Sequence, residues 1–198
     1  ALLVALHDIG KVSPGFQLKE PFRGYHADAF PDFAALSAQS FESDHARTGA
    51  SALWDYAGTF FEQPVVSEII AMHHGSISKE PSRTDRGEIY GGETWHAERE
   101  RLIRTLECYY GCVDTNAEFS PVFRNCLAGL VTVADWIGSD ERFFSSSSSD
   151  SEDSSARRPA TKAVEACGFI QPQMSPNCTF QDVFGNQPYG VQKKASSV

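Results

Sequence analysis

The chain has 198 residues, of which 41% are hydrophobic, so it is long enough to bury one sizeable core but cramped for two full domains. Its formal net charge of −9 argues against a protein that coats duplex DNA through a broad basic face. We find no apolar run of about 18 residues, no signal peptide and no CxxC pair among the five cysteines, so we expect a cytoplasmic protein without a membrane span.

The first predicted element is a short apolar helix that ends in a His–Asp pair. Residues 1–6 are apolar throughout and lack an N-cap residue, which suggests a start cut from a longer chain. Val4 precedes His7 by three residues and Asp8 by four, so both polar side chains should lie beside a buried stripe. A buried carboxylate without a partner costs roughly several kcal/mol, so Asp8 needs either an ion pair or a metal.

Helical periodicity dominates the rest of the chain, and strand patterns are scarce. We predict long loops at 12–34 and 75–93, where Gly and Pro are frequent. Apolar residues recur every three or four positions in four segments, which are 41–60, 65–74, 95–110 and 121–138. The sequence therefore predicts an all-α helical bundle with long loops.

Three of these helices carry further candidate ligands. His45 begins a helix rich in small residues, and His73 follows the apolar face of the next helix. His74 is turned about 100° from His73, yet the two rings can converge where the helix stops at Gly75. Asp135 lies on an otherwise apolar helix as a second buried carboxylate, for which a structural salt bridge is the alternative.

The composition changes abruptly after residue 144. A low-complexity acidic, Ser-rich stretch at 145–158 predicts a disordered linker or loop. A helix is expected at 160–167, followed by a Pro-, Asn- and Gln-rich end. We therefore divide the chain into residues 1–144, the linker 145–158 and a C-terminal part, 159–198.

Four imidazoles and two carboxylates on separate apolar helices predict a metal site, because without an ion several of these groups would be buried unsatisfied. The candidate ligands are His7, Asp8, His45, His73, His74 and Asp135. Such a donor set favours one or two ions of manganese, iron, cobalt or nickel over magnesium, which prefers oxygen ligands.

The order of these motifs resembles the all-helical HD phosphohydrolase superfamily. The segments HDIGKVSPGFQ at 7–17, HHG at 73–75 and ADWIGSD at 134–140 are similar to the nuclease domain of the type I CRISPR-associated nuclease-helicase. This resemblance covers about residues 1–144, and segments within 180–192 are similar to the lead into the family's helicase domain, which is absent here.

The resemblance implies the roles of individual residues. Asp8 would bridge two metals, with His45, His73 and His74 completing one site and His7 and Asp135 holding the other. A further histidine that the family carries before the HD pair has no counterpart here, so we expect the second site to fill more weakly. From its position after the HD pair, Lys11 is placed to meet the substrate phosphate, with a solvated lysine at a helix end as the alternative. Ser139, one turn after Asp135, could hydrogen-bond the substrate or a ligand, with a structural role as the alternative.

The resemblance also implies a function: metal-activated cleavage of single-stranded DNA during CRISPR interference. The implied partners are single-stranded DNA, the helicase domain of the same polypeptide and the RNA-guided surveillance complex. Two alternatives stay open, namely hydrolysis of nucleotides or cyclic dinucleotides, and a docking module with weakened catalysis.

Residues of the two predicted loops could serve the substrate. Basic side chains could guide the strand and aromatic side chains could stack its bases. These residues are Lys19, Arg23, Lys79, Arg83 and Arg86, with Phe16, Tyr25 and Phe30. His96, in contrast, is expected at the surface of a polar helix face.

Overall fold

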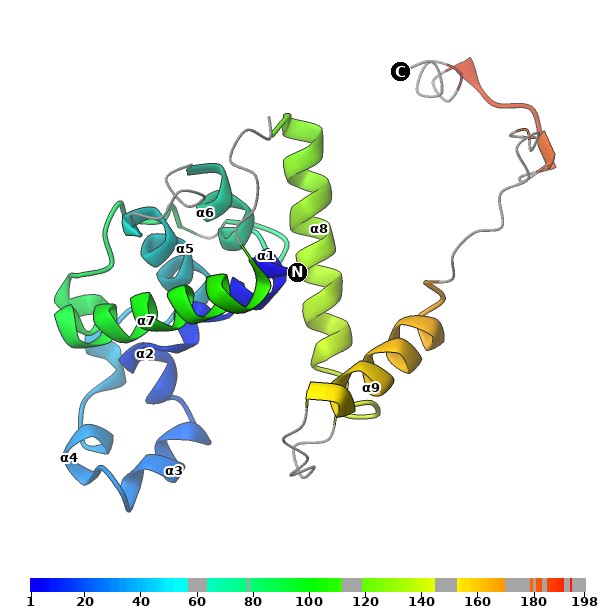
Figure 1. Cartoon of the computed structure of the whole chain (residues 1–198). Helices are drawn as coiled ribbons and strands as arrows, with labels where there is room; N and C mark the ends of the chain where they lie inside the picture. Colours follow the sequence, from blue (N-terminus) through cyan, green and yellow to red (C-terminus); the bar gives the residue numbers. More distant parts are fainter. Residues whose placement is uncertain are drawn as a thin grey trace. The chain divides into compact units, whose positions relative to one another are not determined.

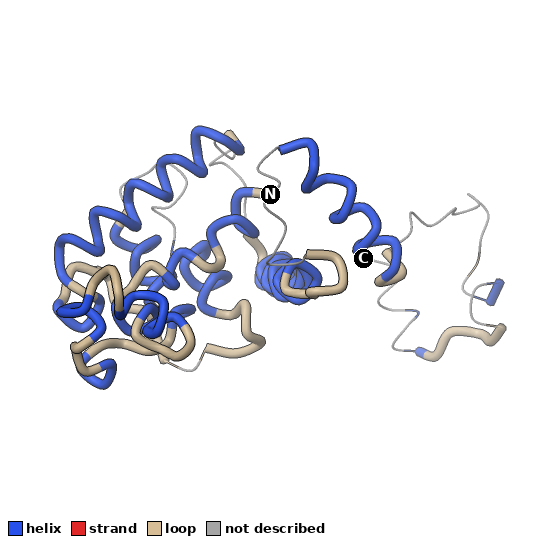
Figure 2. Tube along the Cα trace, turned by 90° about the horizontal axis from the view of Figure 1, so that it is seen from below, coloured by secondary structure: helices blue, strands red, loops and turns tan. Residues whose placement is uncertain are grey.

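The computed structural model describes residues 1–56, 64–77, 79–111, 119–144, 153–169, 179, 181–182, 185–190 and 193. All regular elements in these ranges are helical, which confirms the all-α prediction (Figure 1, Figure 2). No helix in the described ranges has the length and apolar character needed to cross a membrane. The chain forms two compact units, residues 1–146 and 147–198.

The body of the first unit surrounds two clusters of buried apolar side chains. It is built from α1 (Leu2–Leu6), the 3-10 turn η1 (Ile9–Lys11), α5 (His45–Asp55), α6 (Pro64–Ala71), α7 (Gly92–Tyr110) and α8 (Pro121–Gly138). The buried core side chains come from α1, η1, α5, α6 and α7 and include Leu2, Leu6, Ile9, Leu53, Val66, Ile70 and Ile103. These five elements share this cluster, and a second buried cluster of Ile69, Ala128 and Val131 joins α6 to α8. The chain segments that carry the candidate ligands, including α8 with Asp135, are therefore held against one another.

Local sequence signals explain where the long helices begin and end. The Asp44 side chain accepts a hydrogen bond from the Arg47 backbone N–H at the start of α5. Ser120 caps α8 in the same way, and Pro121 occupies the first helical position. Gly111 ends α7 with a φ of 81°.

The segment predicted as the loop 12–34 instead forms three short helices. These are α2 (Pro14–Gln17), α3 (Phe22–Ala27) and α4 (Pro31–Ala34), with α3 and α4 packed together (Figure 1). The loop prediction was wrong because α2 and α4 each begin with a proline, whose fixed φ suits a first helical position as well as a turn. A further 3-10 turn, η2 (Ala38–Ser40), leads towards α5.

The second predicted loop, 75–93, is irregular over most of the part that the structure describes. The 3-10 turn η3 (Glu88–Tyr90) interrupts it, and α7 begins at Gly92, three residues before the expected 95. Residue 78 lies outside the described residues.

The second unit contains α9 (Asp153–Ala166). This helix starts earlier than the predicted 160, with Pro159 inside it, so the end of the expected linker is helical. The first part of that predicted linker, residues 145–152, lies outside the described residues.

Candidate metal centre

The structure brings all six predicted ligand residues together. Their donor atoms form two groups, His45 with His73 and His74, and His7 with Asp8 and Asp135, and the atoms within each group lie within 4.8 Å of one another. The residues come from the end of α1, the start of α5, the turn after α6 and the last part of α8. Segments far apart in the sequence therefore meet at one place.

The three-histidine group is built around the buried ring of His73. Its centroid lies 5.4 Å from that of His45 and 4.0 Å from that of His74. Nε2 of His45 and Nε2 of His74 are 3.0 Å apart. Nδ1 of His73 lies 2.6 Å from the Ile70 carbonyl oxygen and donates to it, which leaves Nε2 unprotonated in the neutral ring. This Nε2 atom is buried and has no hydrogen-bond partner among the described residues.

In the second group, His7 contacts both carboxylates. Its Nε2 atom lies 3.2 Å from Oδ2 of Asp8 and 3.2 Å from Oδ1 of Asp135. Nδ1 of His7 lies 2.5 Å from the carbonyl oxygen of Val4, one turn earlier in α1. Ser139 donates a hydrogen bond of 3.3 Å to Oδ1 of Asp135, so in this structure it contacts a candidate ligand.

Asp8 lies between the two groups. Its Oδ1 atom is 3.4 Å from Nε2 of His45, while its Oδ2 atom faces His7. Nζ of Lys11 is 2.5 Å from the same Oδ2 atom. One carboxylate thus offers an oxygen to each group, as a bridging ligand requires, and Lys11 balances its charge.

Close backbone packing explains how Asp8 reaches His45. An ideal Cβ placed on Gly10 would lie 1.9 Å from the carbonyl oxygen of His45 and 2.5 Å from the backbone N of Gly49. Only a residue without a side chain permits this approach of η1 to the first turns of α5. Thr132 of α8 donates a 2.8 Å hydrogen bond to the carbonyl oxygen of His73. These contacts fix the separations of the elements that carry the ligands.

The surroundings shift the pKa values of the candidate ligands in different directions. Burial raises the pKa of Asp8, but hydrogen bonds from His45, His7 and Lys11 outweigh burial and hold it well below its usual range. Burial lowers the pKa of His7, yet its contacts with Asp8, the Val4 carbonyl and Asp135 bring it to about 9. Burial, followed by the neighbouring histidines, lowers the pKa of His73 to about 4. Burial and then His45 lower the pKa of His74. His73 and His74 are therefore neutral at pH 7, as metal ligands must be.

The arrangement fits a divalent transition metal. Four imidazoles and two carboxylates converge, and the lone pair of a buried nitrogen, Nε2 of His73, meets no donor from the residues that the structure describes. The centre is also open to solvent on one side, because His74 is exposed and the side chains of Asp8 and Lys11 are 29% and 38% exposed.

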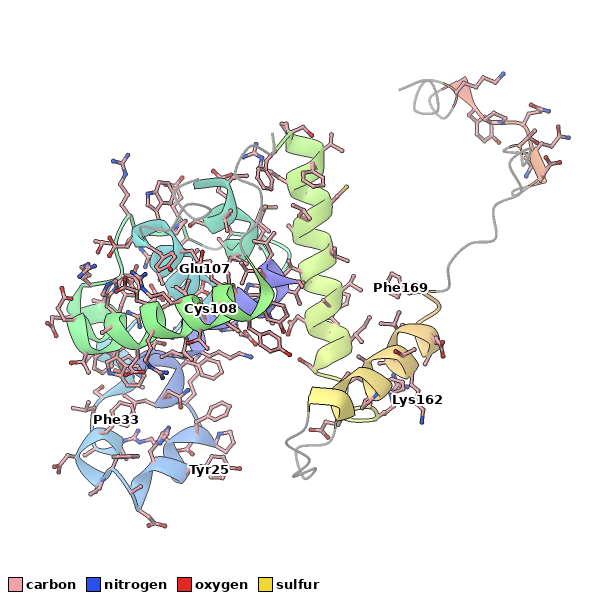
Figure 3. The ribbon with its side chains drawn as sticks, in the orientation of Figure 1. Tyr25, Phe33, Glu107, Cys108, Lys162 and Phe169 are labelled. Carbon is pink, nitrogen blue, oxygen red and sulfur yellow. The ribbon has the colours of Figure 1, made fainter. Side chains whose placement is uncertain are left out.

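Several basic side chains that were expected to guide the strand are engaged within the protein. Lys19 donates to the Ser43 carbonyl, Arg23 to the Ala34 carbonyl, and Arg86 pairs with Asp55 and Glu93. The ring of Phe16 lies 5.3 Å from that of His45. Tyr25 and Phe30 are exposed, and Figure 3 shows Tyr25 on α3.

One expectation was wrong, because His96 is buried. Its Nδ1 atom lies 2.5 Å from a carboxylate oxygen of Asp85, which is fully buried, as is the neighbouring Arg99. The helix pattern did not indicate this, because the residues that cover the polar face of α7 come from the irregular segment before it.

Comparisons with known proteins place the chain in a family. The family model described as Cas3, HD domain, matches residues 1–144. No curated protein matches the chain. A solved structure described as a CRISPR-associated protein is similar over 100% of this chain, with a TM-score of 0.63 and 24% identity, which indicates a shared fold. The match covers 24% of that protein, so this chain corresponds to about a quarter of its length. The chain therefore belongs to the family of Cas3 HD domains, a CRISPR-associated group of HD-type metal-dependent hydrolases.

Proposed function

We propose that the chain is a nuclease that hydrolyses phosphodiester bonds of single-stranded DNA during CRISPR interference. The observation that carries this proposal is the position of Asp8, which offers one oxygen to the three-histidine group and the other to His7. A carboxylate between two groups of ligands suits a pair of ions acting on one phosphate.

Each group would hold one ion. His45, His73 and His74 would bind the first together with Asp8, and His7 and Asp135 would bind the second with the same carboxylate. The imidazole-rich donor set favours manganese, iron, cobalt or nickel over magnesium. Ions held there would lower the pKa of water and withdraw charge from the phosphoryl oxygens.

The protein's own side chains would orient the reaction. Lys11, which contacts Asp8 and is partly exposed, would bind a non-bridging phosphate oxygen once a metal neutralises that carboxylate. Ser139 would hold Asp135 in place through its hydrogen bond. The exposed side of the centre, formed by His74, Asp8 and Lys11, would admit a polymer.

The family suggests how a single strand would reach this centre. The net charge of −9 gives little affinity for duplex DNA, so we propose that a helicase domain of the same polypeptide delivers a single strand after recruitment by an RNA-guided surveillance complex. Tyr25 and Phe30, both exposed, would offer rings on which its bases can stack.

The test is a cleavage assay with Mn²⁺. Circular single-stranded DNA, the matching duplex, nucleoside triphosphates and cyclic dinucleotides would be offered at equal phosphate concentration. Cutting of the circle alone supports the proposal, because a circle has no ends for an exonuclease. Preferential hydrolysis of the nucleotides would overturn it in favour of a small-molecule phosphohydrolase, and no hydrolysis of any substrate would favour a docking module.

We expect the two ligand groups to bind Mn²⁺ with unequal affinities. The first group has four protein ligands if Asp8 is included, whereas the second has three, one of which is the same carboxylate. Calorimetric titration should resolve two steps. His74→Asn should weaken the tighter step and Asp135→Asn the weaker one, and equal filling of both groups would contradict this assignment.

Metal binding by the second group should release a proton near pH 7. The pKa of His7 is about 9 without metal, so its ring is mostly protonated at pH 7 and must lose that proton to become a ligand. The apparent affinity of the weaker step should therefore rise about tenfold per pH unit from 7 towards 9 and then level off. Binding heats in buffers of different ionisation enthalpy measure this release, and His7→Gln should remove it. A weaker step that is independent of buffer and pH would speak against a protonated His7.

A further inference from the structure

Outside the metal centre, α7 carries a fully buried ion pair between Arg99 and Asp85. Nε of Arg99 lies 2.5 Å from Oδ2 of Asp85, and Nη2 donates a 3.0 Å hydrogen bond to the Asp85 carbonyl. Nη1 donates to two further carbonyl oxygens, that of Val12 at 2.8 Å and that of Tyr90 at 3.1 Å. The guanidinium therefore joins α7, the segment before it and the chain just after η1.

The contact with Val12 belongs to a series that follows the His–Asp pair. Three consecutive carbonyl oxygens accept hydrogen bonds from side chains: that of Gly10 from Ser13 at 2.8 Å, that of Lys11 from Gln17 at 2.9 Å, and that of Val12 from Arg99. Ser13 and Gln17 are close in sequence to the oxygens that they bind. Of the three donors, Arg99 comes from a helix distant in sequence, α7. It therefore fixes the position of the segment after Asp8 relative to α7.

The same network reaches the helix that begins with His45. The hydroxyl groups of Tyr90 and Ser82 are 2.9 Å apart, and the backbone N–H of Ser82 donates a 2.9 Å hydrogen bond to Oγ of Ser51 in α5. Arg99 thus contacts the segment that follows Asp8 directly and α5 through Tyr90 and Ser82.

Asp55, Asp85 and His96 in this region have oxygen and nitrogen atoms close enough to hold a cation. Both carboxylates already face guanidinium groups, Asp85 that of Arg99 and Asp55 that of Arg86 at 2.9 Å. The charges are balanced without an ion, which favours a structural role for the cluster over a second metal site.

We propose that Arg99 is a positioning residue for the metal centre: by holding the Val12 carbonyl from α7, it fixes the segment 8–12 so that Asp8 and Lys11 face the histidine groups. This inference rests on the proposed function of the same site. Groups that do not contact the metal but hold its ligands in place change metal affinity or activity by about 10- to 100-fold when they are removed.

Two variants separate positioning from stability. Arg99→Lys keeps a cation beside Asp85 but loses the planar fork that reaches Val12 at the same time. The double variant Arg99→Met with Asp85→Leu removes both buried charges together, which avoids an uncompensated carboxylate. Tyr56→Phe is the control, because it removes the 2.6 Å hydrogen bond from Tyr56 to Glu107 of α7 and touches none of the three carbonyl oxygens.

The measurements are the melting temperature, the Mn²⁺ affinity and the kcat for circular single-stranded DNA, all in the full chain. We expect both Arg99 variants to lose about tenfold or more in Mn²⁺ affinity and in kcat while folded, and Tyr56→Phe to lower only the melting temperature. Wild-type affinity and kcat in the folded double variant would overturn the proposal, as would an equal loss in Tyr56→Phe. If the unaltered chain binds Mn²⁺ but cuts no DNA, the proposed function fails, and the affinities still decide the role of Arg99.

Discussion

Replacing Asp8 by alanine is expected to lower Mn²⁺-dependent cleavage of circular single-stranded DNA by about 100-fold or more. The substitution removes both oxygens that face the two ligand groups, so neither ion would keep its shared ligand. It also leaves Lys11 without the carboxylate that it contacts at 2.5 Å. Calorimetry should show weaker binding in both steps, and circular dichroism should show that the helices persist.

The matched control is Asp140→Asn, at the end of the same ADWIGSD segment that carries Asp135. Asp140 pairs with Arg142 at 2.5 Å and belongs to neither ligand group. This variant should cut DNA and bind Mn²⁺ as the unaltered chain does. Cleavage that survives in Asp8→Ala at the level of the control would mean that the activity comes from elsewhere.

Gly10→Ala is expected to destabilise the fold and to weaken the metal centre together. The added Cβ would lie 1.9 Å from the carbonyl oxygen of His45, and a backbone atom in the first turn of a helix cannot yield easily. Overpacking of this kind costs about 1–3 kcal/mol, because η1 must move away from α5. That movement would separate Asp8 from His45, so Mn²⁺ affinity should fall by about tenfold or more. Denaturant unfolding and calorimetry measure the two effects.

Gly129→Ala supplies the comparison. This glycine lies within α8, and a Cβ added there would meet nothing within 4 Å. Alanine should stabilise the helix by about 0.5–1 kcal/mol and leave Mn²⁺ affinity unchanged. If Gly10→Ala behaves like this control, the packing of η1 on α5 does not determine the ligand geometry.

The sequence predicted which candidate ligand residues come together, but not the packing contacts that hold them there. His7, Asp8, His73 and Asp135 each stand beside apolar residues at helical spacing, so the pattern alone places them towards the interior. The pairing of Gly10 with Gly49 was not predicted, because a close approach between two elements has no signature in either element alone. Tertiary packing decides such contacts.

The sequence analysis also failed to predict two short helices and the burial of two polar residues. Pro14 and Pro31 fit turns and helix starts equally well, so the short helices α2 and α4 were read as loop. His96 and Arg99 lie on a helix face whose sequence is polar, and both are buried. Their partner, the carboxylate of Asp85, belongs to the irregular segment before α7. A charged residue can be placed inside only once its partner is known.

The ring of His73 has a thermodynamic consequence. Its Nδ1 atom donates to the Ile70 carbonyl, and its buried Nε2 atom has no hydrogen-bond donor in the described part of the chain, so the folded protein carries the desolvation cost of an unpaired acceptor. A cation that binds there relieves this cost in the native state alone, because the donors are dispersed in the denatured ensemble. Chelators should accordingly lower the unfolding temperature even where they leave the helical content at room temperature intact.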